Sequence, residues 1–329
     1  MWKSLETTLA AVFVLAALPA PAGADIAPGS MNVVWNEGAQ DCKAHPQPPL
    51  QIHAYNSRTF ILRENLCSTF EAPFMYLLTG SDRALLIDTG DVADPKAMPL
   101  AKTVERLLPP GLPLLVVHSH RHMDHRAGDR QFAGLSNVRV IGYDIESVRR
   151  FYGFAHWPDG IGTIDLGDRI VDVLPTPGHN ETHVVFYDRS TALLLSGDFM
   201  LPARLLVDDD QAEIASAKRV ADFVRNRPVS FVLGAHIEED VRGQFFPWES
   251  QYHPRERVLQ MTKRDLLALP AAAAQFDGFY SNAGQFTFMN STHNLLALGS
   301  AVIAAAVALI GLAVWFVRRR RSKRAILRS

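Results

Sequence analysis

Short apolar runs recur along the first two thirds of the chain, and polar or turn-forming residues separate them. Runs of this length that are rich in Val, Ile, Leu and Phe predict buried β-strands. We expect strands at residues 59–63, 74–78, 84–88, 112–117, 138–141, 170–174, 184–187, 192–196 and 230–233.

Helical patterns lie between some of these runs, at residues 95–108, 144–151, 211–227 and 256–269. Strands in meanders with occasional helices differ from the strict strand–helix alternation of a parallel sheet. The order therefore favours a layered α/β body with two central sheets.

Residues 295–317 form the longest apolar run and carry no charge. As a helix they would be about 34 Å long, enough to cross a hydrocarbon core of about 30 Å. A basic cluster follows at once, which a buried core helix would not explain and a membrane span does, because basic residues stay on the cytoplasmic side. We predict a transmembrane helix at 295–317, a cytoplasmic tail at 318–329 and a juxtamembrane linker at 271–294. A tripartite sorting signal would look similar, but no distinctive motif precedes the helix.

The N-terminus has the pattern of a secretory signal. Lys3 precedes an uncharged run at residues 9–18, and Ala22-Gly23-Ala24 follows, so we expect a signal peptide at 1–24. The run is too short for an uncleaved membrane anchor. The body, residues 25–270, should then lie outside the cytoplasm, and the layout suits a bacterial envelope with the body facing the periplasm or the exterior.

The tail changes the charge balance of the body. It holds seven of the 33 basic residues, which leaves 26 basic against 34 acidic residues in the rest of the chain. An acidic body disfavours a nucleic-acid substrate, because phosphate backbones select basic faces. We therefore expect a small-molecule substrate.

Two cysteines, Cys42 and Cys67, lie early in the body. Export makes a disulfide between them possible. Two buried thiols are the alternative.

The stretch HSHRHMDH, residues 118–125, directly follows an expected strand. If the chain stays extended there, His120, His122 and Asp124 point to one side. If it turns into a helix near Asp124, His125 points away from the first two histidines, and Asp124 with His125 can serve a second ion.

Further ligands have to come from other strand ends. Candidates are His179, Asp198 and His236, each of which follows an apolar run and lies close to a glycine. Imidazole and carboxylate ligands suit zinc best, and a catalytic zinc site keeps one position open for water.

These motifs together resemble the metallo-β-lactamase superfamily. Residues 119–125 are similar to its HxHxDH signature, and residues 84–90, ALLIDTG, are similar to its early strand-and-turn motif. His179, Asp198 and His236 fall in the order and rough spacing of its later metal ligands. The resemblance covers residues 55–240.

The resemblance implies a four-layer αββα sandwich with two zinc ions at one edge of the sheets. It assigns His120, His122 and His179 to the first zinc, Asp124, His125 and His236 to the second, and Asp198 to both. It also implies hydrolysis of an ester, thioester, lactone or amide by a metal-bridging hydroxide. Asp124 and Asp198 are the expected catalytic residues, with Asp124 a candidate to orient the hydroxide.

Other branches of the superfamily fit less well. The di-iron redox branch has Glu where this chain has His122. The ligand types match those of glyoxalase II-like thioesterases, but no helical glutathione-binding domain is evident after His236. A β-lactamase, an iron-dependent dioxygenase and a non-catalytic metal-binding scaffold remain alternatives, and the oligomeric state stays open.

Several polar residues near these motifs have a supporting or a structural interpretation. We expect Asp88 to hydrogen-bond to the ligand loops and His118 to be packed or hydrogen-bonded. For His183 two interpretations stay open, a supporting group or leaving-group acid, and a histidine satisfied at a strand start. Residues 208–210 are expected to cap a helix, and the aromatic cluster at residues 151–157 to belong to the core.

Overall fold

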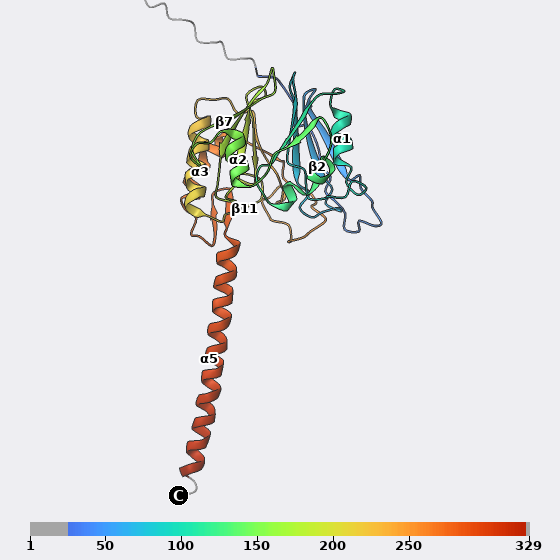
Figure 1. Ribbon diagram of the computed structural model, residues 1–329. Coiled ribbons are helices and arrows are strands. Elements are labelled where there is room, and N and C mark those ends of the chain that lie inside the picture. The colour runs from blue at the N-terminus through green and yellow to red at the C-terminus, as the bar shows by residue number, and fades with distance from the viewer. Residues whose placement is uncertain (1–25, 327–329) are drawn as a thin grey trace, which may run out of the picture.

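The structure is a computed structural model that describes residues 26–326, with side chains for residues 26–316. The predicted signal peptide, residues 1–24, lies outside the described residues. Two six-stranded sheets and a small three-stranded sheet make up the body (Figure 1).

The first sheet has the strand order β1-β2-β3-β4-β5-β6 and the second has β13-β12-β10-β9-β8-β7. The first consists of β1 (Leu50–Asn56), β2 (Thr59–Glu64), β3 (Phe74–Thr79), β4 (Ala84–Ile87), β5 (Leu114–Val117) and β6 (Val138–Val140). The second consists of β7 (Gly162–Asp165), β8 (Ile170–Pro175), β9 (Val184–Asp188), β10 (Leu193–Gly197), β12 (Phe231–Gly234) and β13 (Gln260–Met261).

The small sheet has the order β11-β15-β14, with β11 (Arg204–Leu206), β14 (Tyr280–Ala283) and β15 (Phe286–Met289). The helices are α1 (Leu100–Leu107), α2 (Ile145–Tyr152), α3 (Asp210–Val224), α4 (Lys263–Ala273) and α5 (Ser291–Ile326), with short 3₁₀ turns η1 (Met123–His125) and η2 (Ala127–Gln131).

Three separate cores define four layers. One lies between the two large sheets and contains Ile61 and Phe186. The others lie between the first sheet and α1, and between the second sheet and α3 with α4. Side chains alternate along β3: Phe74 enters the middle core and Met75 the outer one, so the strand is apolar on both faces. The αββα sandwich expected from the sequence is therefore confirmed.

All nine expected strands are present, each within two residues of the expected ends. Six further strands were not expected, namely β1, β7, β11, β13, β14 and β15. The helix expected at 256–269 starts later, because Thr262 and Asp265 form a capping box that begins α4 at Lys263.

The linker expected at residues 271–294 is wrong. These residues hold the end of α4 and the β14–β15 hairpin, and β15 pairs in parallel with β11 from Arg204↔Thr287 to Leu206↔Met289. Phe286 and Phe288 of the hairpin are buried in the same core as α3 and α4. The folded body therefore continues to about the start of α5.

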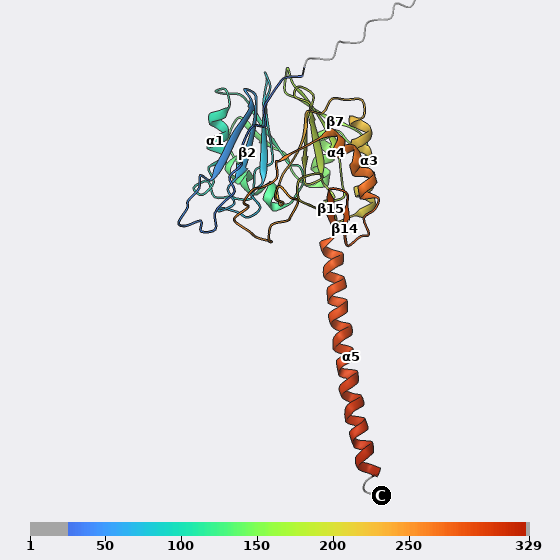
Figure 2. The ribbon, with the colours of Figure 1, turned by 180° about the vertical axis from the view of Figure 1, so that it is seen from behind.

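Helix α5 leaves the body and extends away from it (Figures 1 and 2). Among the described residues, Ser291–Phe316 is the one helical stretch long and apolar enough to cross a membrane, and none of its most apolar window is buried. It starts four residues before the expected span, directly after the hairpin.

Cys42 and Cys67 form a disulfide, as one of the two sequence interpretations proposed. The bridge joins the irregular N-terminal segment to the loop that follows β2. This loop includes the backbone carbonyl of Glu71, which accepts a hydrogen bond from His236.

A buried ion pair connects the two large sheets. Arg169, next to β8, binds the Asp188 carboxylate of β9 through two hydrogen bonds of 2.7 and 3.0 Å. The same guanidinium donates to Thr59 Oγ1 at the start of β2 at 2.8 Å. Both charged side chains are almost completely buried. Removing one partner would therefore leave the other as a buried charge without a counter-charge.

Replacing Asp188 by Ala should lower the free energy of unfolding by about 3–5 kcal/mol, because the Arg169 guanidinium stays buried without a counter-charge. Asp168→Ala is the matched control: it removes a pair with Arg58 whose side chains are 51% and 44% exposed. That change should cost at most about 1 kcal/mol. Denaturant unfolding of the full-length protein in detergent measures both, and equal losses would contradict the role of burial.

Candidate metal centre

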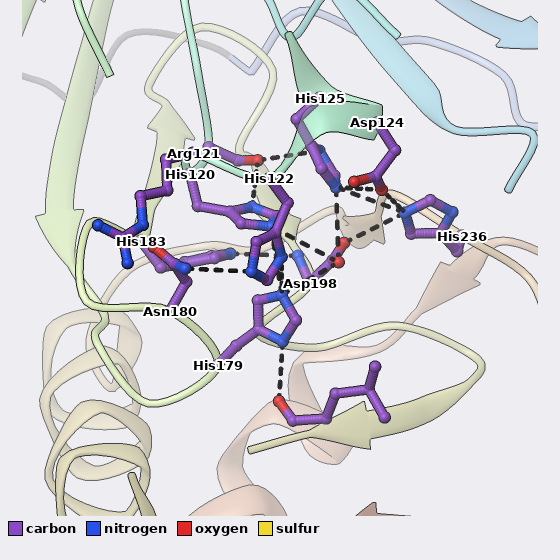
Figure 3. Close-up of polar contacts among 12 residues, drawn as sticks. His120, Arg121, His122, Asp124, His125, His179, Asn180, His183, Asp198 and His236 are labelled. Carbon is purple, nitrogen blue, oxygen red and sulfur yellow. Dashed lines mark hydrogen bonds and ion pairs between the residues drawn. The ribbon is translucent and has the colours of Figure 1, made fainter. Parts of the chain in front are cut away.

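The candidate ligands lie at one edge of the sandwich, where several strands end. β4 and β5 run parallel, and so do β10 and β12, so the residues that follow them meet at the same edge. The loop after β5 carries His120 to His125, and the turn after β10 carries Asp198. Figure 3 shows these side chains pointing toward one another.

The first group consists of His120, His122 and His179. His120 Nε2 lies 2.8 Å from His122 Nδ1, and His179 Nε2 lies 3.2 and 3.0 Å from these two atoms. Three ring nitrogens thus converge on one point. Their lone pairs can serve a single cation, the arrangement that three-histidine zinc sites use.

The second group consists of Asp124, His125, Asp198 and His236. Asp124 Oδ2 lies 3.0 Å from His125 Nε2 and 3.3 Å from His236 Nε2. Asp198 Oδ2 lies 3.5 Å from His125 Nε2 and also 3.4 Å from His179 Nε2 of the first group. Asp198 therefore contacts both groups, as a bridging carboxylate would.

Hydrogen bonds on the outer side fix the orientation of the rings. Nδ1 of His179 donates to the Leu206 carbonyl at 2.8 Å, and Nδ1 of His236 donates to the Glu71 carbonyl at 2.7 Å. In both rings Nδ1 is taken up by an outer carbonyl, so Nε2 is the nitrogen that faces the site.

Asp88 fixes His125 and the start of the ligand loop. It lies just after β4 with a positive φ of 65°, and its Oδ2 accepts from His125 Nδ1 at 3.0 Å. The same carboxylate accepts from the backbone N–H of Ser119 at 2.7 Å and from its hydroxyl at 2.8 Å. The expected supporting role of Asp88 agrees with these contacts.

Burial and neighbouring charges shift histidine pKa values in opposite directions in the two ligand groups. Burial lowers the pKa of His120 well below its usual range, and the neighbouring imidazoles lower it further. Burial likewise lowers the pKa of His122. In the second group burial would also lower the pKa of His236, but Asp198 and Asp124 outweigh it and raise that pKa to about 10. His120 and His122 are thus held neutral, and the second group balances two carboxylates against protonated imidazoles that a cation would replace.

The donor set fits metal ions. Nitrogen and carboxylate donors in these proportions suit zinc, and Asp198 Oδ1 is buried without a hydrogen-bond partner among the described residues. A buried carboxylate oxygen left unpaired is costly unless a cation completes its surroundings.

The turn that presents Asp198 requires a glycine. Gly197 has a φ of 52°, and a Cβ there would lie 2.8 Å from both Ser119 Cβ and His183 Nε2. No larger residue fits without displacing one of these groups.

His183 is a fully hydrogen-bonded histidine that also supports the site, so it shares features of both interpretations. Its Nε2 accepts from the backbone N–H of Asp198 at 3.1 Å, and its Nδ1 lies 2.8 Å from Thr176 Oγ1. The ring is fully buried and stacks on His120 with a centroid distance of 5.1 Å. With both nitrogens engaged it supports the site and has no proton to give to a leaving group.

The remaining candidates are structural, as expected. His118 contacts Asp129 at 2.8 Å, and Asp209 caps α3 by accepting from the Ala212 N–H. Tyr152 and Phe154 belong to the middle core.

Two features of the site were missed by sequence reasoning. One is Ser119, whose hydroxyl lies between Asp88 and the His120 ring. The other is a groove beside His236 with Phe70, Phe246 and Trp248 in its walls. The run FFPW at residues 245–248 was a signal for it, but no sequence pattern placed this run next to the histidine.

Comparisons with known proteins agree on one family. The family model described as "Metallo-beta-lactamase superfamily" matches residues 68–236. The hydroxyacylglutathione hydrolase of Dechloromonas aromatica is 28% identical over 144 residues, which is 44% of this chain and 49% of that protein. The acyl-coenzyme A thioesterase MBLAC2 of Homo sapiens is 25% identical over 230 residues, which is 56% of this chain and 77% of that protein.

A solved metallo-β-lactamase from Pontibacter korlensis is 17% identical, with a TM-score of 0.49, over 69% of this chain and 100% of that one. The chain spans about a third to a half of the length of the first hydroxyacylglutathione hydrolases that it matches.

Replacing Asp88 by Asn should weaken zinc binding by about 10–100-fold, because the amide cannot accept from His125 and Ser119 together. Asp129→Asn is the matched control, since Asp129 contacts His118 and Thr89 and none of the candidate ligands. Titration of the metal-stripped protein with zinc against a competing chelator measures both affinities. An unchanged affinity in Asp88→Asn would show that the ring of His125 needs no outer partner.

Proposed function

The chain belongs to the metallo-β-lactamase superfamily, and from its site we propose that it is a zinc-dependent hydrolase of an ester, thioester, lactone or amide. The observation that carries the proposal is the pair of ligand groups that share Asp198. A scaffold without catalysis would not need this carboxylate between two complete sets.

The proposed ligands follow the two groups. His120, His122 and His179 would hold one zinc, Asp124, His125 and His236 the other, and Asp198 would contact both. When bound, the two ions would supply an activated water and stabilise negative charge on the carbonyl oxygen of the substrate.

Residues behind the ligands would hold the ligands in position. Asp88 and Ser119 hold the loop that carries the first four ligands, and His183 holds the backbone of Asp198. The side chain of Asp124 is 20% exposed and that of the other carboxylate, Asp198, is 13% exposed. Asp124 is therefore the carboxylate best placed to accept a hydrogen bond from an incoming water, and we propose this as its catalytic role.

A thioester is the bond class that we favour. Hydroxyacylglutathione hydrolase and acyl-coenzyme A thioesterase, both similar to this chain, have names that describe thioester cleavage. The described residues after His236 form loops, α4 and the β14–β15 hairpin, so recognition of the substrate would use different parts from a helical glutathione-binding domain.

We also propose that α5 anchors the protein in a membrane, with the basic tail, residues 318–329, in the cytoplasm and the body on the other side. The large apolar side chains of α5, such as Leu298 and Ile303, are exposed, which only a surrounding apolar phase would stabilise. The disulfide supports an oxidising compartment for the body.

An Asp198→Asn change should lower metal occupancy and abolish hydrolysis, because the amide cannot neutralise two cations. The fold should persist, since Gly197 and His183 still form the turn. Elemental analysis of the purified protein, a panel of chromogenic ester, thioester, lactone and cephalosporin substrates, and circular dichroism measure the three effects. Asp209→Asn, at the cap of α3, controls for the chemical change.

Close to two zincs in the parent protein, with cleavage that a chelator abolishes, would support the hydrolase. Turnover unchanged in Asp198→Asn would contradict a shared carboxylate. Iron in place of zinc would point to the dioxygenase, and a full zinc site that cleaves nothing would point to a scaffold.

A further inference from the structure

The metal centre and the apolar helix are connected through very few residues. His179 donates to the carbonyl of Leu206 in β11, and the next residue, Val207, donates to the carbonyl of Met289 in β15 at 2.9 Å. Met289 lies two residues before the start of α5 at Ser291. β11 and β15 lie at the end of the body from which α5 leaves (Figures 1 and 2).

This path bounds the distance from the site to the helix. One strand spacing, two extended residues and one side chain add up to on the order of 15 Å. A helix that crosses a bilayer therefore brings the metal-bearing edge close to the headgroups, with the opposite end of the sandwich pointing away.

Apolar and basic side chains are exposed at this edge. Phe279 directly precedes β14, and Tyr280 is the first residue of that strand and pairs with Met289. Each is 45% exposed. Val241 and Arg242 line one cavity together with Tyr280, and both are exposed. Aromatic rings beside basic groups suit the boundary between headgroups and acyl chains.

A groove with aromatic walls ends at the metal centre. Phe70, Phe246 and Trp248 line it together with His236, and Arg204 of β11 lines it from the side of the small sheet. Trp248 is 62% exposed and lies 6.3 Å from the Phe70 ring.

The groove wall is held firmly from behind. Phe246 stacks on His253 at 4.1 Å, and His253 lies 3.0 Å from Glu256. Glu256 in turn forms a buried ion pair with Arg63 of β2. Phe246 is therefore held in place before a chain enters.

We propose that the metal-bearing edge lies against a phospholipid bilayer and that the substrate is an acyl thioester or ester with a long hydrocarbon chain, drawn from that bilayer. The inference rests on the proposed function and adds the substrate class. Trp248, Phe246 and Phe70 hold the part of the chain next to the reacting carbonyl. Water supplies the hydroxyl that bonds to the acyl carbon, the carbon–sulfur or carbon–oxygen bond breaks, and the remaining proton goes to the leaving thiol or alcohol.

The first test compares butanoyl and hexadecanoyl thioesters of N-acetylcysteamine as substrates of the full-length protein in vesicles of phosphatidylcholine and phosphatidylglycerol. We expect kcat/KM for the long chain to exceed that for the short one by at least about tenfold, because more methylene groups leave water. Trp248→Ser should lower this ratio by about tenfold, since one large apolar wall is lost.

Leu135→Ser is the matched control and should leave both rates unchanged. Leu135 is 46% exposed and precedes β6, whose start pairs with the start of β5, whereas the ligand loop follows the end of β5. An equal effect of the two changes on the ratio would overturn the proposal.

The second test needs no catalysis. In a Trp315→Phe background, which removes the tryptophan of α5, lipids with brominated acyl chains should quench part of the fluorescence, and a further Trp248→Phe change should remove that part. No quenching, together with equal rates for the two chain lengths, would overturn the inference. Metal-dependent cleavage of the short thioester would in that case still support the hydrolase. Quenching without cleavage of either thioester would instead overturn the thioester as the bond that is cleaved, and leave the membrane contact.

Discussion

Two carboxylates and five imidazoles held within a few ångströms of one another, at a buried edge, form the constraint on which the rest of this structure depends. Such a cluster is unfavourable alone, because charges and lone pairs of one kind face each other away from water. Asp198 contacts both groups, and its Oδ1 is buried without a hydrogen-bond partner among the described residues. Cations between the groups would turn the same contacts into stabilising ones.

The sandwich holds this cluster in place through groups that lie behind the ligands. Asp88, Ser119 and His183 each bind a ligand or the backbone next to it, and carbonyls of Glu71 and Leu206 orient two of the rings. Arg169 pairs with Asp188 in the second sheet and donates to Thr59 in the first. The ligands that come from the two sheets therefore keep a fixed separation. The precision of the centre therefore comes from contacts remote from it in the sequence.

The small sheet connects the candidate metal centre to the apolar helix α5. β11 accepts a hydrogen bond from a candidate ligand, pairs with β15, and β15 leads into α5. If α5 lies in a bilayer, the orientation of the metal centre is no longer free, because a parallel pair of short strands sets it. This arrangement explains why a stretch that looks like a linker in the sequence is folded.

The sequence by itself determined the main strands, the apolar helix and all seven candidate ligands. Apolar runs separated by turn-forming residues mark the strands. His120 to His125 are neighbours in the chain, so local spacing alone brings them together. His179, Asp198 and His236 were found because each follows an apolar run close to a glycine and matches the order of the later metal ligands of the superfamily. Only the tertiary structure decided the role of His183, the position of Ser119, the groove at Trp248 and the pairing of β15 with β11. These depend on contacts between residues far apart in the chain, as the bond from His236 to the Glu71 carbonyl does over 165 residues. Contacts over that distance leave no periodic signal in the sequence, because their energy comes from three-dimensional packing.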